Sequence, residues 1–168
     1  FFSKKNPEIK FVSPVAGTIT NIIRGPKRKI EIIKIKASSN QDSVKYSVSG
    51  WDKKNRDDLK FLLTSSGNWP FIHQRPYGII ANPIDTPKAI FVSTVKTDPL
   101  YGDLQFILKD QKNDFQMGIN LLNKLVDQPV FLGVEKEFSD YFESIEGVQH
   151  YTVQGPHPAG NLSLHIQE

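Results

Sequence analysis

The chain has 168 residues, of which 38% are hydrophobic and 23% are charged, and its formal net charge is +3. This composition excludes an intrinsically disordered chain, and the basic residues alternate too closely with acids to indicate a nucleic-acid partner. The absence of cysteine excludes disulfides, thiolate metal sites and a cysteine nucleophile in these residues, and no apolar run is long enough to span a membrane.

Residues 9–36 are predicted to form β-strands. Apolar and polar residues alternate at 30–36, and the basic stretch GPKRK before it indicates a turn. Gly17 and Gly25 stand where tight turns commonly need a positive φ. The expected strands are 9–17, 18–23 and 30–36, and the polar stretch 37–43 is expected to be a loop at a domain boundary.

The stretch FVSPVAGTITNIIRG (11–25) resembles one arm of a lipoyl or biotinyl carrier domain. In such domains a modified lysine precedes the strand, and Lys4 and Lys5 lie at about that spacing. However, neither an acid nor a methionine flanks these lysines, and an Asn-Pro pair follows them directly. We therefore predict that residues 1–45 are part of a barrel-sandwich hybrid module without a lysine-linked cofactor.

Residues 46–168 are predicted to form a Rossmann-like α/β domain with a parallel sheet. Short apolar runs typical of buried parallel strands alternate here with segments of helical periodicity, as in half of a doubly wound sheet. Four prolines exclude regular structure over 68–87. The expected helices are 55–67, 102–126 and 136–145, and the expected strands are 88–95, 129–134 and 148–155.

The loops 94–102 and 154–160 follow two predicted strands at the edge where such folds bind ligands. Neither contains a G-x-G-x-x-G or P-loop pattern, and their prolines leave few amides for a pyrophosphate, so dinucleotide binding is not expected. His157 and His165 do not have the spacing of a helical zinc pair, which favours a loop-shaping role for His157. The basic turn 25–29 is interpreted as a solvated turn, with a phosphate contact as the alternative.

Four segments spread over the whole chain carry one family resemblance. They are KKNPEIKFVSPVAGTITNIIRGPKRK, SSGNWPFIHQRPYGIIANPIDTPKAIFVS, TDPL and GPHPAGNLSLHI. In this order they resemble the NqrA family, the A-type subunit of the sodium-translocating NADH:quinone oxidoreductase, whereas lipoyl domains share only the Pro-x-x-Gly portion. The resemblance implies a larger protein that continues with a ubiquitin-like SLBB domain and a helical region. The single internal methionine, Met117, agrees with a piece of a longer chain.

The resemblance also implies where such a protein works. It would lie peripherally on the cytoplasmic side of the bacterial inner membrane against the B-type membrane subunit, held there only through partner subunits. NAD, FAD, FMN and iron–sulfur centres would belong to other subunits, with ubiquinone as substrate, sodium export as the coupled process and no redox centre in this segment. The candidates for quinone contact are Asp98, Pro99 and Leu100, because their loop lies at the strand ends.

The alternative is the nucleotide- or flavin-binding C-type subunit of an Rnf-like electron transport complex. Such relatives place a glycine-rich, cofactor-cradling loop after the helix that corresponds to 56–66. Here Trp69, Pro70, Phe71 and Ile72 occupy that position, and bulky residues keep the backbone away from a flavin ring or a phosphate. The missing glycines and cysteines therefore favour the cofactor-free family.

Overall fold

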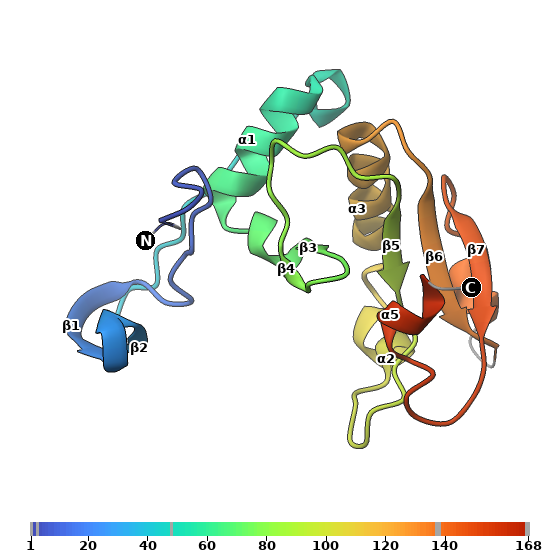
Figure 1. Cartoon of the computed structure of the whole chain (residues 1–168). Coiled ribbons are helices and arrows are strands. Elements are labelled where there is room, and N and C mark those ends of the chain that lie inside the picture. Colours follow the sequence, from blue (N-terminus) through green and yellow to red (C-terminus); the bar gives the residue numbers. More distant parts are fainter. Residues whose placement is uncertain (1, 3, 48, 137–138, 167–168) are drawn as a thin grey trace.

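The computed structural model describes residues 2, 4–47, 49–136 and 139–166 as a mixed α/β chain (Figure 1). An antiparallel hairpin lies apart from a three-stranded parallel sheet, and helix α1 (Arg56–Ser66), preceded by the 3-10 turn η2 (Trp51–Lys53), stands between them. The predicted combination of a β module and an α/β unit is confirmed at this level. None of the helices in the described part has the length and apolar character needed to cross a membrane.

Strands β1 (Gly17–Arg24) and β2 (Ile30–Ala37) pair antiparallel and are joined through the 3-10 turn η1 (Pro26–Arg28). The predicted strands at 18–23 and 30–36 and the turn between them are therefore confirmed. Every residue of the hairpin is at least partly exposed. Its two strands thus hold each other through backbone hydrogen bonds without a buried core of their own.

The positive φ expected at Gly17 and Gly25 is wrong. The φ of Gly25 is −90°, and the positive angles in this hairpin fall instead on Lys27 (54°) and Arg28 (60°). Gly17 serves a different purpose, since a Cβ there would overlap the carbonyl oxygen of Lys36 on the paired strand. The glycine is required for a close approach of two backbones rather than for a turn.

The strand expected at 9–17 is wrong for all but its last residue. The Lys10 N–H donates to the Thr64 carbonyl oxygen at 3.0 Å, which ties this segment to the end of α1. Further along, the Ser13 hydroxyl donates to the carbonyl oxygen of Val15 at 2.6 Å. Local side-chain bonds of this kind compete with strand pairing, so the chain bends before β1 begins.

Helix α1 confirms the helix predicted at 55–67. The side chain of Asn55 caps its start by accepting a hydrogen bond from the Asp58 N–H at 2.8 Å, and Gly67 ends it with a φ of 79°. Leu59 is fully buried on its inner side. The buried cluster around it comprises Ile9, Leu59, Trp69, Leu125 and Val126.

The proline-rich segment 68–87 is largely irregular, as predicted. It contains the 3-10 turn η3 (Trp69–Phe71) and two antiparallel two-residue strands, β3 (His73–Gln74) and β4 (Ile79–Ile80), which the sequence did not indicate. The indole N–H of Trp69 donates to the carbonyl oxygen of Ala81 at 2.7 Å. This bond joins the start of the segment to the residue after β4.

Strands β5 (Ile90–Ser93), β6 (Val130–Glu135) and β7 (Gln149–Val153) form a parallel sheet in the order β5–β6–β7. All three predicted strands of this region and their parallel arrangement are confirmed. Leu132 of the central strand β6 has no exposed surface, as expected for a strand with neighbours on both sides and both faces.

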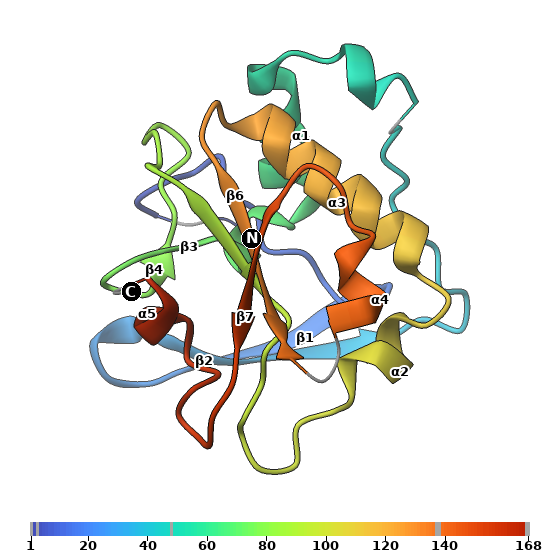
Figure 2. The ribbon, with the colours of Figure 1, turned by 90° about the vertical axis from the view of Figure 1, so that its right-hand side faces the viewer.

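Helices α3 (Lys112–Leu125) and α4 (Ser139–Glu143) cover one face of the sheet (Figure 2). Ile119 of α3 and Phe142 of α4 are buried there in one cluster with Leu132. The apolar residues that predicted the helices are thus the residues that hold them on the sheet.

The opposite face of the sheet is aromatic. The rings of Phe91 and Phe131 stack with their centroids 4.9 Å apart, and Tyr151 meets Phe91 edge-on at 6.5 Å. A short helix, α5 (Leu162–His165), lies against this face, and the Asn161 side chain caps it. The sequence had not indicated this helix.

The single helix predicted at 102–126 is wrong, because α2 (Leu104–Leu108) ends before α3 begins. The last carbonyl oxygen of α2 accepts hydrogen bonds from the Gln111 N–H and from the Tyr141 hydroxyl of α4. In a continuous helix this carbonyl oxygen would accept a hydrogen bond from the N–H four residues later. Because the two other donors occupy it, the helix ends and the chain turns there. Helix α4 is shorter than predicted, and residues 137–138 lie outside the described part.

Candidate functional site

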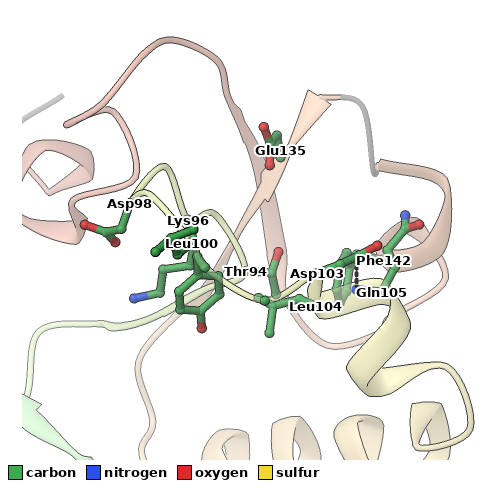
Figure 3. Close-up of a pocket in the computed structure, with 11 residues that line it drawn as sticks. Thr94, Lys96, Asp98, Leu100, Asp103, Leu104, Gln105, Glu135 and Phe142 are labelled. Carbon is green, nitrogen blue, oxygen red and sulfur yellow. Dashed lines mark hydrogen bonds between the residues drawn. The ribbon is translucent and has the colours of Figure 1, made fainter.

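A hollow of about 290 Å³ lies at the C-terminal ends of β5 and β6 (Figure 3). The loop 94–102, predicted to lie at this edge of the sheet, forms much of its wall together with the start of α2. This edge is where α/β sheets generally bind ligands. The lining residues are Thr94, Lys96, Asp98, Leu100, Tyr101, Gly102, Asp103, Leu104, Gln105, Glu135 and Phe142.

The base of the hollow is fixed to the sheet. Thr94, the first residue after β5, is buried, and both its N–H and its hydroxyl donate to the carbonyl oxygen of Gly133 at 2.9 Å. These two hydrogen bonds to one carbonyl oxygen of the central strand fix the start of the loop 94–102 to the sheet. The loop beyond therefore starts from a rigid position.

One carboxylate on the lining has a structural partner. Asp103 caps α2, since its Oδ1 accepts hydrogen bonds from the N–H groups of Gln105 (2.8 Å) and Phe106 (3.2 Å). This cap sets the direction in which the chain leaves the hollow. Asp103 is thus needed for the shape of the site whether or not a ligand binds.

The charge of the lining is mainly negative. Asp98, Asp103 and Glu135 contribute carboxylates, and Lys96, whose Nζ lies 5.3 Å from the centre of the Tyr101 ring, contributes the only ammonium group of the lining. Repulsion from three carboxylates disfavours a phosphate-bearing ligand at this place. A neutral ligand with hydrogen-bond acceptors is compatible with it.

Two of the three residues predicted for quinone contact line the hollow. These are Asp98 and Leu100; Pro99 is not part of the lining. The Leu100 side chain is completely exposed, and its backbone is left-handed with a φ of 63°. An exposed apolar side chain on a strained backbone is the kind of outlier that accompanies ligand-contacting loops.

The second strand-end loop, 154–160, packs against the first. The Gly160 N–H donates to the Thr97 hydroxyl oxygen at 3.0 Å, and a Cβ on Gly160 would come within 2.7 Å of the Thr97 nitrogen. The His157 ring lies 3.4 Å from the same hydroxyl and 3.6 Å from an Asp98 carboxylate oxygen. These contacts agree with the loop-shaping role predicted for His157.

A tyrosine–histidine pair lies on the aromatic face of the sheet. The Tyr151 hydroxyl is 3.0 Å from Nδ1 of His165, and Nε2 of His165 is 2.6 Å from the carbonyl oxygen of Ala159. Because a carbonyl oxygen only accepts, Nε2 of His165 carries a proton, and the Tyr151 hydroxyl donates to Nδ1 whenever that nitrogen is unprotonated. Burial raises the pKa of Tyr151 to about 12.

The sequence analysis did not predict the pair of Tyr151 and His165, although one residue in the sequence indicated close packing at this place. Gly133 interrupts the apolar run of β6, and a glycine inside a strand indicates close packing by another group. A Cβ on Gly133 would come within 2.5 Å of the Tyr151 hydroxyl oxygen. The glycine therefore makes room for the tyrosine ring.

The remaining sequence candidates do not form a site together. The described residues hold no group of three metal-binding side chains, and the ring of His150 is engaged with the carbonyl oxygen of Phe142 at 3.0 Å. Lys5 lines a separate hollow of about 540 Å³ between the N-terminal segment and the β3–β4 pair. That hollow is lined by Lys5, Asn6, Ile9, His73, Gln74, Gly78, Ile79, Ile80 and Asn82.

Two protein-family models match this chain. The NqrA second alpha/beta domain matches residues 54–168, and the NqrA N-terminal barrel-sandwich hybrid domain matches residues 1–38. The chain belongs to the NqrA family. This confirms the resemblance seen in the four sequence segments, including the barrel-sandwich hybrid character of the N-terminal part.

Relatives of this NqrA chain are named as the A-type subunit of a Na(+)-translocating NADH-quinone reductase. The protein from Alcanivorax borkumensis is 32% identical, that from Rhodopirellula baltica 32% and that from Pseudomonas aeruginosa 31%, each over 99% of the present chain. The chain spans only 37–38% of the length of these relatives. The alternative of an Rnf-like C-type subunit gains no support from these matches.

Proposed function

We propose that the chain forms part of the NqrA subunit of a Na⁺-translocating NADH:ubiquinone reductase. The observation that carries this proposal is the similarity, over 99% of the chain, to proteins named as that subunit. In this role the segment supports electron transfer to ubiquinone without holding a redox centre, while NAD, FAD, FMN and iron–sulfur centres belong to other subunits. Its partner is the B-type membrane subunit, on the cytoplasmic side of the bacterial inner membrane.

The finer architecture is part of the same proposal. Residues 1–45 would be a portion of a lipoyl-like module, supported by the exposed antiparallel hairpin. Residues 46–168 would be a Rossmann-like domain, supported by the parallel order β5–β6–β7 with α3 and α4 on one face. An SLBB domain would follow in the complete protein.

The loop that carries Asp98, Pro99 and Leu100 is the proposed place of quinone contact. A quinone is neutral, so three carboxylates on the lining of the hollow do not repel it as they would a phosphate. Its carbonyl oxygens need donors, which the Lys96 ammonium and the Gln105 amide supply. Leu100, completely exposed at this hollow, supplies an apolar surface for the ring or the tail.

The test is a Leu100→Ala substitution in full-length NqrA within the complete complex. Loss of an apolar contact of this size should raise the KM for quinone about tenfold or more, while NADH oxidation by a soluble acceptor stays the same. Ile84→Ala is the matched control, because Ile84 is also highly exposed, at 80%, and does not line the hollow. An unchanged KM in both Leu100→Ala and Asp98→Ala would remove this loop from the quinone site.

A further inference from the structure

The turn that closes the β1–β2 hairpin has an unusual combination of backbone and side chains. The Lys29 N–H donates to the carbonyl oxygen of Pro26 at 3.2 Å, and both residues between them, Lys27 and Arg28, have positive φ. This is the geometry of a type I′ turn, which favours Asn-Gly because those residues tolerate a left-handed backbone. Long basic side chains are disfavoured at both positions.

Strain of this kind is kept where the side chains are needed for another purpose. Lys27, Arg28 and Lys29 are all exposed, and so is Arg24, whose Nη1 donates to the carbonyl oxygen of Arg28 at 3.2 Å. Glu31 is the only acid in the hairpin sequence, which contains six basic residues. The Glu31 carboxylate lies against Gly25, so the turn presents four positive charges of which one is offset.

The surroundings of the turn indicate the kind of partner. The hairpin lies apart from the parallel sheet and its helices, so the turn is accessible to a broad surface (Figure 1). The turn Gly25–Lys29 itself holds neither an aromatic ring nor a large apolar side chain, whereas the strands beside it expose Ile22 and Ile32. Single-stranded nucleic acids need aromatic rings for stacking, whereas apolar side chains beside a basic cluster also suit the surface of a membrane. A cluster of four basic residues without aromatic rings fits an anionic lipid surface.

We propose that the turn Gly25–Lys29, together with Arg24, binds the phosphate headgroups of an anionic membrane. The contact is direct, and so departs from the expectation that only partner subunits hold the chain at a membrane. It stands on the charge and the backbone of the hairpin, and it does not depend on the quinone site.

The experiment is flotation of full-length NqrA with phosphatidylcholine vesicles, with and without phosphatidylglycerol. The wild type should bind only the anionic vesicles, and less as salt rises. Lys27→Asn/Arg28→Gly should weaken binding about thirtyfold, since each basic residue near an anionic surface contributes about 1 kcal/mol. Lys34→Asn/Lys36→Asn removes the same charge from exposed positions on β2 and should weaken binding much less.

The double substitution in the turn also tests the strain. Asn-Gly suits a type I′ turn, so this variant should fold at least as well as the wild type, with slower amide hydrogen exchange at Ile23 and Ile32. Faster exchange there would overturn the strain argument. Equal vesicle binding by wild type and turn variant, or an equal loss in the β2 variant, would overturn the membrane site. So would binding to an acidic polypeptide or DNA without binding to anionic vesicles.

Discussion

The β1–β2 hairpin and the β5–β6–β7 sheet use similar apolar residues with opposite results. In the sheet, Leu132 is 0% exposed and Val134 is 2% exposed. In the hairpin, Ile19 is 57% exposed and Ile32 is 50% exposed, although the strands pair over more residues. The difference lies in coverage, because α3 and α4 pack on the sheet whereas the hairpin lies apart (Figure 1).

Alternating apolar residues therefore predict a strand, but they do not predict what lies on its face. Burial, and with it most of the stabilisation, comes from the element that covers the strand. The two regions should accordingly respond very differently to the same kind of substitution.

The largest difference is expected from truncation of a core side chain. Leu132→Ala should lower the free energy of unfolding by about 2–5 kcal/mol, because it leaves a cavity among Ile119 and Phe142. Ile32→Ala in the hairpin should change it by about 1 kcal/mol or less, because half of that side chain is in water. Urea denaturation of both variants measures the contrast, and equal losses would contradict it.

A smaller effect on stability is expected from adding a methyl group at Gly133, on the aromatic face of the sheet. Gly133→Ala should cost about 1–3 kcal/mol, because the new methyl group meets the hydroxyl of Tyr151. Gly118→Ala in α3 is the control, since no atom lies within 4 Å of a Cβ there and alanine favours a helix by about 1 kcal/mol. Thermal unfolding should show opposite shifts, and a stabilising Gly133→Ala would show that Tyr151 does not pack as described.

The smallest effect concerns the dependence of stability on pH. The pKa of Tyr151 is raised from 10.0 to about 12 in the folded state. Between these values the unfolded chain releases a proton that the folded chain keeps, so stability is full below pH 10 and falls as the pH rises toward 12. Tyr151→Phe should reduce this fall in urea titrations. An identical fall in wild type and variant would assign it to other groups.

The sheet and α1 were predictable because their signals are local. Asn55 and Gly67 mark the ends of α1, and short apolar runs mark the three strands. The break between α2 and α3 was not predictable, because one of the donors that occupies the last carbonyl of α2 is Tyr141, 33 residues along the chain. Helix packing competed there with a local preference for continuing the helix.

The candidate site was predictable in position and not in detail. Strand order places the loop with Asp98 at the ligand-binding edge. The left-handed backbone at Leu100 belongs to a local turn, in which the Tyr101 N–H donates to the Asp98 carbonyl oxygen at 3.3 Å, but no glycine or asparagine stands at position 100 to indicate a positive φ. The strained turn at Lys27 and Arg28 was hidden in the same way, since glycine rather than lysine is the sequence signal for positive φ.

The role that we propose for this chain, as part of an NqrA protein at the quinone end of a reductase, can be tested directly. Membranes containing the complete complex, with and without full-length NqrA, would be compared in two activities. These are NADH oxidation by a soluble artificial acceptor and sodium-dependent quinone reduction. Loss of NqrA should abolish quinone reduction and leave oxidation by the soluble acceptor intact. Loss of both activities would contradict this role and would place NqrA at NADH entry or in the assembly of the whole complex.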